Sequence, residues 1–260
     1  MSHLAHLCIY PIKSLDRVFV DRAIVLPSGA LKGDREFAIV DQAGKFVNGK
    51  RTAKVHLLRS SFDLAARTVS LGVEGSTERM VFNLEDDRSQ LESWLSDYFG
   101  FSVQLLQNTE TGFPDDLNAP GPTLISTATL AAVTGWFPEL SLEQVRSRFR
   151  SNLEIDGVPA FWEDCLFRDA DEPMPFSVGS VQFLGINPCQ RCVVVTRDPQ
   201  TGSAYPNFQK TFVAQRQATL PTWAATSRFN HFYRLAVNTR VVPLGKDAIA
   251  QLELGAMVKV

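Results

Sequence analysis

The sequence predicts a mainly β fold of the α+β class, with an N-terminal β-barrel-like module packed on a C-terminal β-barrel. Three observations predict it. Many short runs of β-branched and aromatic residues are separated by turn residues. The few helical segments do not alternate with strands as they do in a doubly wound parallel sheet. Residues 108–123 are rich in Gly, Pro, Asp and Asn, so we expect modules at residues 1–107 and 116–260.

The first hundred residues are expected to form mostly strands. The candidate runs are "LAHLCIY", "RVFVDRAIVL", "EFAIVD", "KVHLLRS", "SFDLAA", "TVSLGV" and "RMVFNL". One helix is predicted over residues 88–99, because its apolar residues share one face, an aspartate precedes it and Gly100 follows it. The run "FSVQLLQ" is then expected to form another strand.

The second half of the chain mixes strands and helices. Three helices are predicted, over "TATLAAVTGWF", over "SLEQVRSRF" with Ser141 as its cap, and over "PNFQKTFVAQRQ". The expected strands are "TLIS", "SNLEI", "SVQFLGI", "CVVVTR", "HFYRLAVN" and "MVKV". We find no internal repeat and no low-complexity tract.

Composition narrows the class of protein. The 260 residues are 45% hydrophobic and 21% charged, which is typical of a globular chain. A net charge of -2 argues against a nucleic-acid partner. The N-terminus lacks the pattern of a signal peptide, and the long uncharged stretch at residues 117–138 contains prolines, so we expect no membrane span. Four cysteines do not make a disulfide scaffold, and we expect a cytoplasmic protein.

The segment "CQRC" places Cys189 and Cys192 three positions apart. Such a pair is compatible with a dithiol redox site, with half of a zinc site, with two buried structural cysteines, or with one thiolate bound to a soft metal. The zinc reading lacks a second close pair, because Cys8 and Cys165 are isolated. In the soft-metal reading, Arg191 favours the ionised form of Cys192.

Basic and hydroxyl residues at the starts of predicted strands form a second chemical signal. They are Lys13 and Ser14 in "IYPIKSL", Arg35 in "LKGDREFAIVD", and Arg146, Arg148 and Arg150 in "VRSRFRSNLEID", which also holds Asn152. Each stretch alone is compatible with a solvated turn or a surface ion pair. Together they supply the point charges and hydroxyl donors that bind phosphate.

Four motifs, in order, resemble the MOSC-domain family, which is named for the C-terminal domain of molybdenum cofactor sulfurase and includes the mitochondrial amidoxime-reducing components. They are "IYPIKS", "GALKGDREFAIVD", "RFRSNLEIDG" with the later "FWED", and "CQRCVVVTRDPQTG". The resemblance covers nearly the whole chain. One departure is Gln190, at a position where the amidoxime-reducing relatives commonly have serine, so we expect the groups around the metal to differ from those in these relatives.

The resemblance implies a molybdenum cofactor, in the molybdopterin form, in a cleft between the two modules. It implies that Cys192 is the metal ligand and the catalytic residue. The cofactor-binding residues that it implies are Lys13, Ser14, Arg35, Arg150, Asn152 and Arg191.

The implied activity is that of an oxidoreductase. It would reduce a small N-hydroxylated substrate, such as a hydroxylamine or an amidoxime, with electrons from a separate electron-donor protein. A second hypothesis is a non-catalytic carrier of the cofactor, or of sulfur on Cys192. A third is a dithiol redox protein that uses Cys189 and Cys192.

Overall fold

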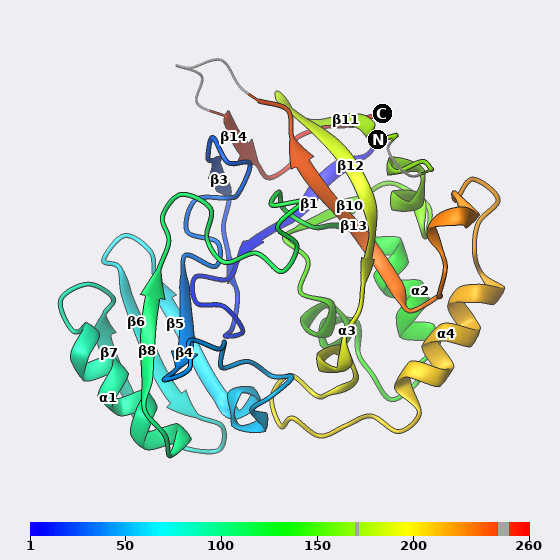
Figure 1. The fold of residues 1–260 in the computed structure, drawn as a ribbon. Coiled ribbons are helices and arrows are strands. Elements are labelled where there is room, and N and C mark those ends of the chain that lie inside the picture. Colours follow the sequence, from blue (N-terminus) through cyan, green and yellow to red (C-terminus); the bar gives the residue numbers. More distant parts are fainter. Residues whose placement is uncertain (170–171, 244–249) are drawn as a thin grey trace.

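The computed structural model describes residues 1–169, 172–243 and 250–260. Strands dominate the chain and helices are few, which confirms the predicted mainly β class. Figure 1 shows two lobes. The smaller lobe holds β4 to β8 and α1, whereas the larger lobe holds the long curled sheet with α2, α3 and α4 beside it.

An eight-stranded sheet forms the frame of the larger lobe, in the order β15-β11-β12-β13-β9-β10-β1-β2. Among the described strands of this sheet, only β9 and β10 pair in parallel. The strands of this sheet are β1 (His3–Ile9), β2 (Val18–Phe19), β9 (Leu124–Ser126), β10 (Leu153–Asp156), β11 (Met174–Val178), β12 (Val181–Gln190), β13 (Arg234–Val241) and β15 (Val258–Lys259).

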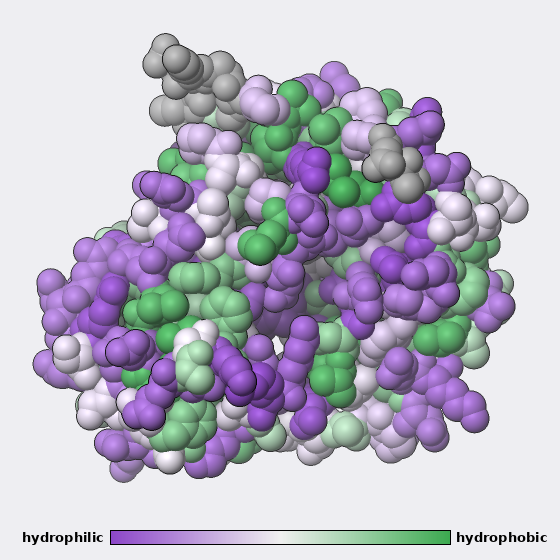
Figure 2. Space-filling view, viewed as in Figure 1, coloured by the Kyte–Doolittle hydropathy of each residue, from purple (hydrophilic) through white to green (hydrophobic). Residues whose placement is uncertain are grey.

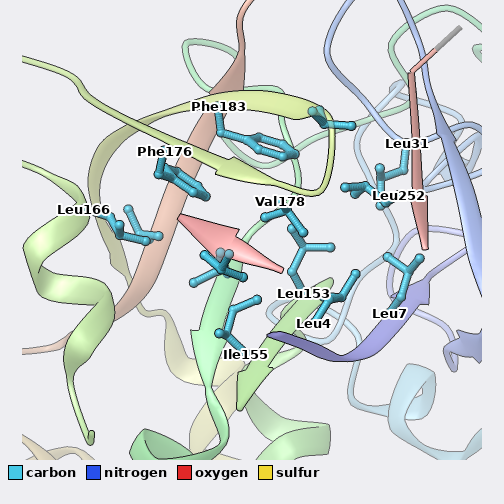
Figure 3. Close-up of a cluster of buried hydrophobic side chains, with 14 of the residues drawn as sticks. Leu4, Leu7, Leu31, Leu153, Ile155, Leu166, Phe176, Val178, Phe183 and Leu252 are labelled. Atoms are coloured by element: carbon cyan, nitrogen blue, oxygen red, sulfur yellow. The ribbon is translucent and has the colours of Figure 1, made fainter. Parts of the chain in front are cut away.

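Strands from the start of the chain complete the larger lobe. β1 pairs with β10, and β3 (Arg22–Val25) pairs with β14 (Ala250–Glu253), so strand pairing crosses the loop at residues 108–123. Figure 3 shows the core that results, in which Leu4 and Leu7 of β1 belong to the same buried cluster as Val178 and Phe183 of the later strands. Burial of this apolar surface holds the N-terminal strands on the C-terminal sheet.

The smaller lobe has its own core. β4 (Phe37–Asp41) pairs with β8 (Val103–Gln107), and β5 (Leu58–Asp63), β6 (Thr68–Val73) and β7 (Arg79–Asn83) form a meander. The predicted helix is present as α1 (Arg88–Phe99), which buries Leu91, Leu95 and Phe99 against these strands. It ends at Gly100, which takes the left-handed conformation expected of a helix-terminating glycine.

Three helices cover the larger lobe, and all three were predicted. They are α2 (Thr127–Gly135), α3 (Leu142–Phe149) and α4 (Phe208–Ala218). The Ser141 side chain caps α3 in a capping box with Gln144. Phe149, Phe208 and Phe212 bring α3 and α4 together in a third core. No helix among the described residues is long and apolar enough to cross a membrane.

The strand predicted over "CVVVTR" is wrong. Residues Val193–Thr196 form a short 3-10 helix, η3, with Cys192 at its start. The preceding strand β12 already runs through Gln190, where its pairing with β13 ends. Three further short helices are η1 (Ala53–Leu57), in part of the predicted strand "KVHLLRS", η2 (Trp162–Leu166) and η4 (Thr226–Arg228).

Candidate functional site

A cavity of about 1280 Å³ lies between the two lobes. Figure 2 shows a hollow near the centre of the viewed face, bordered mainly by hydrophilic residues. Eleven lysines and arginines but only six aspartates and glutamates line the cavity, although the chain as a whole has a net charge of -2. The positive side chains are therefore concentrated in this cavity.

All of the predicted site residues line this one cavity. Lys13, Ser14 and Arg35 come from the first forty residues, whereas the others come from the ends of α3 and β12. The full set is Lys13, Ser14, Arg35, Arg150, Asn152, Arg191 and Cys192. The structure thus brings together residues that are up to 179 positions apart in the sequence, and their individual roles stay predictions.

Tyr10, which follows β1, is the platform on which two of the predicted arginines meet. The guanidinium carbon lies 4.9 Å from the ring centroid for Arg35 and 4.1 Å for Arg150. Both arginines have left-handed backbone conformations, with φ of 50° and 53°. Non-glycine residues rarely adopt this region, and such residues cluster at functional sites. Burial lowers the pKa of Arg150, and the nearby Arg35 charge adds to this effect, so an anion here is favoured.

Asn152 is buried beside these arginines and holds one of them in place. Its Nδ2 donates to the Cys8 carbonyl at 3.0 Å, and its Oδ1 accepts from Arg35 Nη1 at 3.3 Å. The same oxygen accepts from the Thr123 backbone N–H at 3.3 Å. Most of its hydrogen-bonding capacity is therefore used within the protein, and this geometry suits a residue that positions Arg35.

Lys13 is buried at the cavity wall. Its Nζ donates to the Phe113 carbonyl at 2.9 Å and to Asp115 Oδ1 at 2.5 Å, and both partners belong to the loop at residues 108–123. Burial lowers the pKa of Lys13, and the Asp115 carboxylate opposes that effect. Ser14 follows with a φ of 76°, so the chain turns sharply at this point. We call Lys13, Arg35 and Arg150 the phosphate clamp, after the role predicted for them.

Arg191 lines the cavity, but its guanidinium mainly joins secondary-structure elements. Nε and Nη2 donate to the Leu235 carbonyl at 3.0 and 2.6 Å, and Nη1 donates to the Phe149 carbonyl at 3.0 Å. These bonds tie the end of β12 to β13 and to the end of α3. Arg191 therefore fixes the position of the next residue, Cys192.

The two cysteines of the "CQRC" segment differ in their surroundings. Cys192 is half-buried at the start of η3, whereas Cys189 is buried and its thiol donates to Asn238 Oδ1 at 2.5 Å. Burial raises the pKa of Cys189 to about 11. All four cysteines are free thiols, and within the described residues no three His, Cys, Asp or Glu side chains gather as metal ligands.

Several cavity residues carried no signal in the sequence. Arg59 of β5 donates to the Pro199 carbonyl at 3.0 Å, and so joins the smaller lobe to the "DPQTG" turn. Arg228 and Arg234 line the cavity from η4 and β13 but lie in no motif. Conversely, the acidic pair of "FWED" does not line the cavity, because both of its carboxylates are buried in η2.

The donor set and the size of the cavity fit a large anionic group. Ligand pockets commonly measure about 300–1,000 Å³, so this cavity has room for a cofactor together with a small substrate. In addition, some buried Nε atoms of cavity arginines have no hydrogen-bond partner within the described part of the chain. These arginines are Arg59, Arg148, Arg197 and Arg234.

The chain is similar to curated proteins called molybdenum cofactor sulfurase. The human protein is 27% identical over 98% of this chain and 34% of its own length. The Drosophila melanogaster protein is 25% identical over 78% of this chain and 29% of its own length. The chain thus spans about a third of the length of these relatives. A solved structure, the YUAD protein from Bacillus subtilis, is 10% identical with a TM-score of 0.38 and covers 99% of this chain and 94% of its own.

Two family models match the chain in succession. The MOSC N-terminal beta barrel domain matches residues 1–111, and the MOSC domain matches residues 123–247. The gap between them falls in the loop that supplies Asp115 to the clamp lysine. The order of the two models agrees with the order of the four sequence motifs. Because the two models together account for most of its length, the chain belongs to the MOSC-domain family.

Proposed function

We propose that the cavity binds a molybdenum cofactor in the molybdopterin form, and that the protein is an oxidoreductase of N-hydroxylated small molecules. The observation that carries this proposal is the meeting of Arg35 and Arg150 over Tyr10, in the cavity that also holds Cys192. Two largely buried guanidiniums held over one ring favour the binding of a phosphate between the lobes. A half-buried cysteine in the same cavity supplies a soft ligand for a metal.

The side chains divide the work of binding. The phosphate clamp holds the pterin phosphate, Ser14 adds a hydroxyl donor, and Asn152 positions Arg35. Arg191 fixes the backbone beside Cys192, whose thiolate is the metal ligand. When bound, the cofactor supplies a metal centre that changes by two electrons, which no side chain of this cavity provides.

The reaction needs two electrons and two protons for each substrate molecule. A hydroxylamine then gives an amine and water, and an amidoxime gives an amidine and water. The electrons come from a separate electron-donor protein, because the buried Cys189 thiol, with its raised pKa, is a poor reductant. The cavity shields the substrate and positions its N–O bond near the end of β12.

A second candidate is a carrier that binds the cofactor, or sulfur on Cys192, and transfers it to another protein. The observation that favours it is the match to relatives named molybdenum cofactor sulfurase. The two candidates share the clamp and the thiolate. They differ in whether the protein converts a substrate at the bound cofactor or only transfers the bound group to another protein.

The test begins with elemental analysis for molybdenum and pterin fluorescence after acid oxidation of the full-length protein. We expect one molybdenum and one pterin per chain, and a marked loss of both in Arg150→Gln. We then expect turnover of benzamidoxime with an artificial electron donor. A protein that holds molybdenum but does not reduce amidoximes or hydroxylamines supports the carrier. A protein reconstituted with cofactor that retains none of it refutes the reductase and the cofactor carrier, and leaves only a carrier of sulfur on Cys192.

A further inference from the structure

The cavity is lined by more positive side chains than the three of the phosphate clamp, and its carboxylates do not neutralise them all. Five of the lining cations have a carboxylate within 4.0 Å. The other six have none within the described ranges, and they are Lys50, Arg150, Arg191, Arg197, Arg228 and Arg234. A single phosphate group bound by the clamp leaves most of this charge without an anionic partner.

Two of these arginines reach the same stretch of β12, because Arg228 Nη2 donates to the Ile186 carbonyl at 3.1 Å and Arg234 donates to the Pro188 carbonyl two residues later. Arg228 ends η4 and Arg234 begins β13, and both are half-buried. Arg234 donates from Nη1 to the Pro188 carbonyl at 3.1 Å and from Nη2 to Asn230 Oδ1 at 2.9 Å. Its Nε is shielded from solvent and has no partner in the described part of the chain. Burial lowers the pKa of Arg234, and the Arg228 charge lowers it further, so the two guanidiniums repel each other.

This arginine pair lies beside the strand end that leads to the metal ligand. Arg234 is paired with Gln190, the last residue of β12, and Cys192 follows two positions later. No hydrogen bond or ion pair joins either arginine to the clamp within the residues that the structure describes, so the pair is a separate group of donors.

We propose that Arg228 and Arg234 form a subsite for an anionic group, a carboxylate or a phosphate, on the N-hydroxylated substrate. Two like charges held together in a cavity are costly until an anion lies between them. Arg228 Nη1 also donates to the carbonyls of Arg168 and Asp169. The N–H groups of each guanidinium that these protein bonds leave unused would donate to the oxygens of such an anion. This inference rests on the proposed function, which it deepens: the substrate class is anionic N-hydroxylated compounds.

The test compares two amidoximes of nearly the same shape. One is 4-carboxybenzamidoxime and the other is the neutral amide 4-carbamoylbenzamidoxime. Binding is measured by isothermal titration calorimetry on the full chain with its cofactor and without an electron donor. Turnover is measured separately, with an artificial donor. We expect wild type to bind the carboxylate about tenfold more tightly or better, the scale of one charge-assisted hydrogen bond.

The variants are Arg234→Gln and Arg228→Gln, each checked for an unchanged melting temperature. Each is expected to lose most of the preference for the carboxylate while binding of the neutral amide stays constant. Arg234→Lys, which keeps the charge, is expected to recover part of the preference. The matched control is Arg197→Gln, because Arg197 lines the same cavity, also lacks a carboxylate partner within 4.0 Å in the described chain, and belongs to neither arginine group.

The outcomes separate the subsite from the reaction. If Arg197→Gln lowers the preference for the carboxylate as much as Arg234→Gln does, the preference comes from the overall positive potential of the cavity, and the subsite is refuted. Equal binding of the two amidoximes by wild type also refutes it, even if both are reduced. Binding of the carboxylate that depends on Arg234, without any turnover, supports the subsite and counts against the proposed reaction.

Discussion

The buried carboxyl of Glu163 gives a prediction about the pH dependence of stability. Glu163 lies in η2, is 1% exposed, and accepts a hydrogen bond from Thr129 Oγ1 at 2.9 Å. Its Oε1 is buried and has no partner among the described residues. Burial, and then the neighbouring Asp164 charge, raise the pKa of Glu163 from 4.5 to about 7. The folded protein therefore keeps this proton over a range in which the unfolded chain releases it.

This difference fixes the sign and the size of the effect. The contribution of Glu163 to stability is fully present below pH 4.5 and is lost as the pH rises to about 7. Each pH unit within that window changes the free energy of unfolding by about 1.4 kcal/mol, so the whole window is worth about 3 kcal/mol.

Glu163→Gln removes the titrating group but keeps an oxygen for Thr129. Urea unfolding of wild type and variant between pH 4.5 and pH 8 gives the difference between their free energies of unfolding. We expect the stability of wild type relative to the variant to fall by about 3 kcal/mol across that range. The exposed Glu78→Gln serves as a control and is expected to show no such trend. A constant difference for Glu163→Gln shows that this carboxyl is ionised in the folded protein, and the reasoning is then wrong.

Three other outcomes are expected. Cys192→Ser should abolish amidoxime reduction and weaken retention of molybdenum, whereas Cys189→Ser should keep most of both. Elemental analysis and turnover check this, and equal losses of activity with the metal retained favour a dithiol mechanism. Asp164→Leu should destabilise the protein by about 3–5 kcal/mol in urea unfolding, because the buried Arg216, which Asp164 contacts at 2.5 Å, then has no carboxylate partner. Adding Arg216→Met should recover most of this loss. Arg150→Gln should lower pterin retention at least tenfold by fluorescence assay, and unchanged retention contradicts the clamp.

Local signals in the sequence predicted most of the helices and strands. The capping residue Ser141 and the terminating Gly100 mark two helix ends, and both have the predicted geometry. The strand predicted from the run "VVVT" is wrong, because the strand preference of β-branched residues depends on packing against neighbouring strands. Here the backbone after Gln190 leaves β13, and η3 forms instead.

The site was predicted less completely than the fold. Family motifs pointed to residues such as Arg35 and Arg150, and the structure adds the Tyr10 ring on which both lie. It also shows that the Asn152 amide is largely satisfied by protein groups. Arg228 and Arg234 are only six positions apart, but the sequence does not show that both line the cavity, because their position beside β12 depends on the pairing of β12 with β13.

The pairing of β3 with β14 has a consequence for folding. Val25 lies opposite Ala250, so these partners are 225 residues apart in the sequence. A ribosome therefore releases β3 long before its partner exists, and the edge of β3 stays open during synthesis. Contacts of such long range slow folding, since loop closure must precede the gain from pairing. We expect the smaller lobe, whose strands pair over less than 75 residues, to fold first during synthesis and the larger lobe to close last.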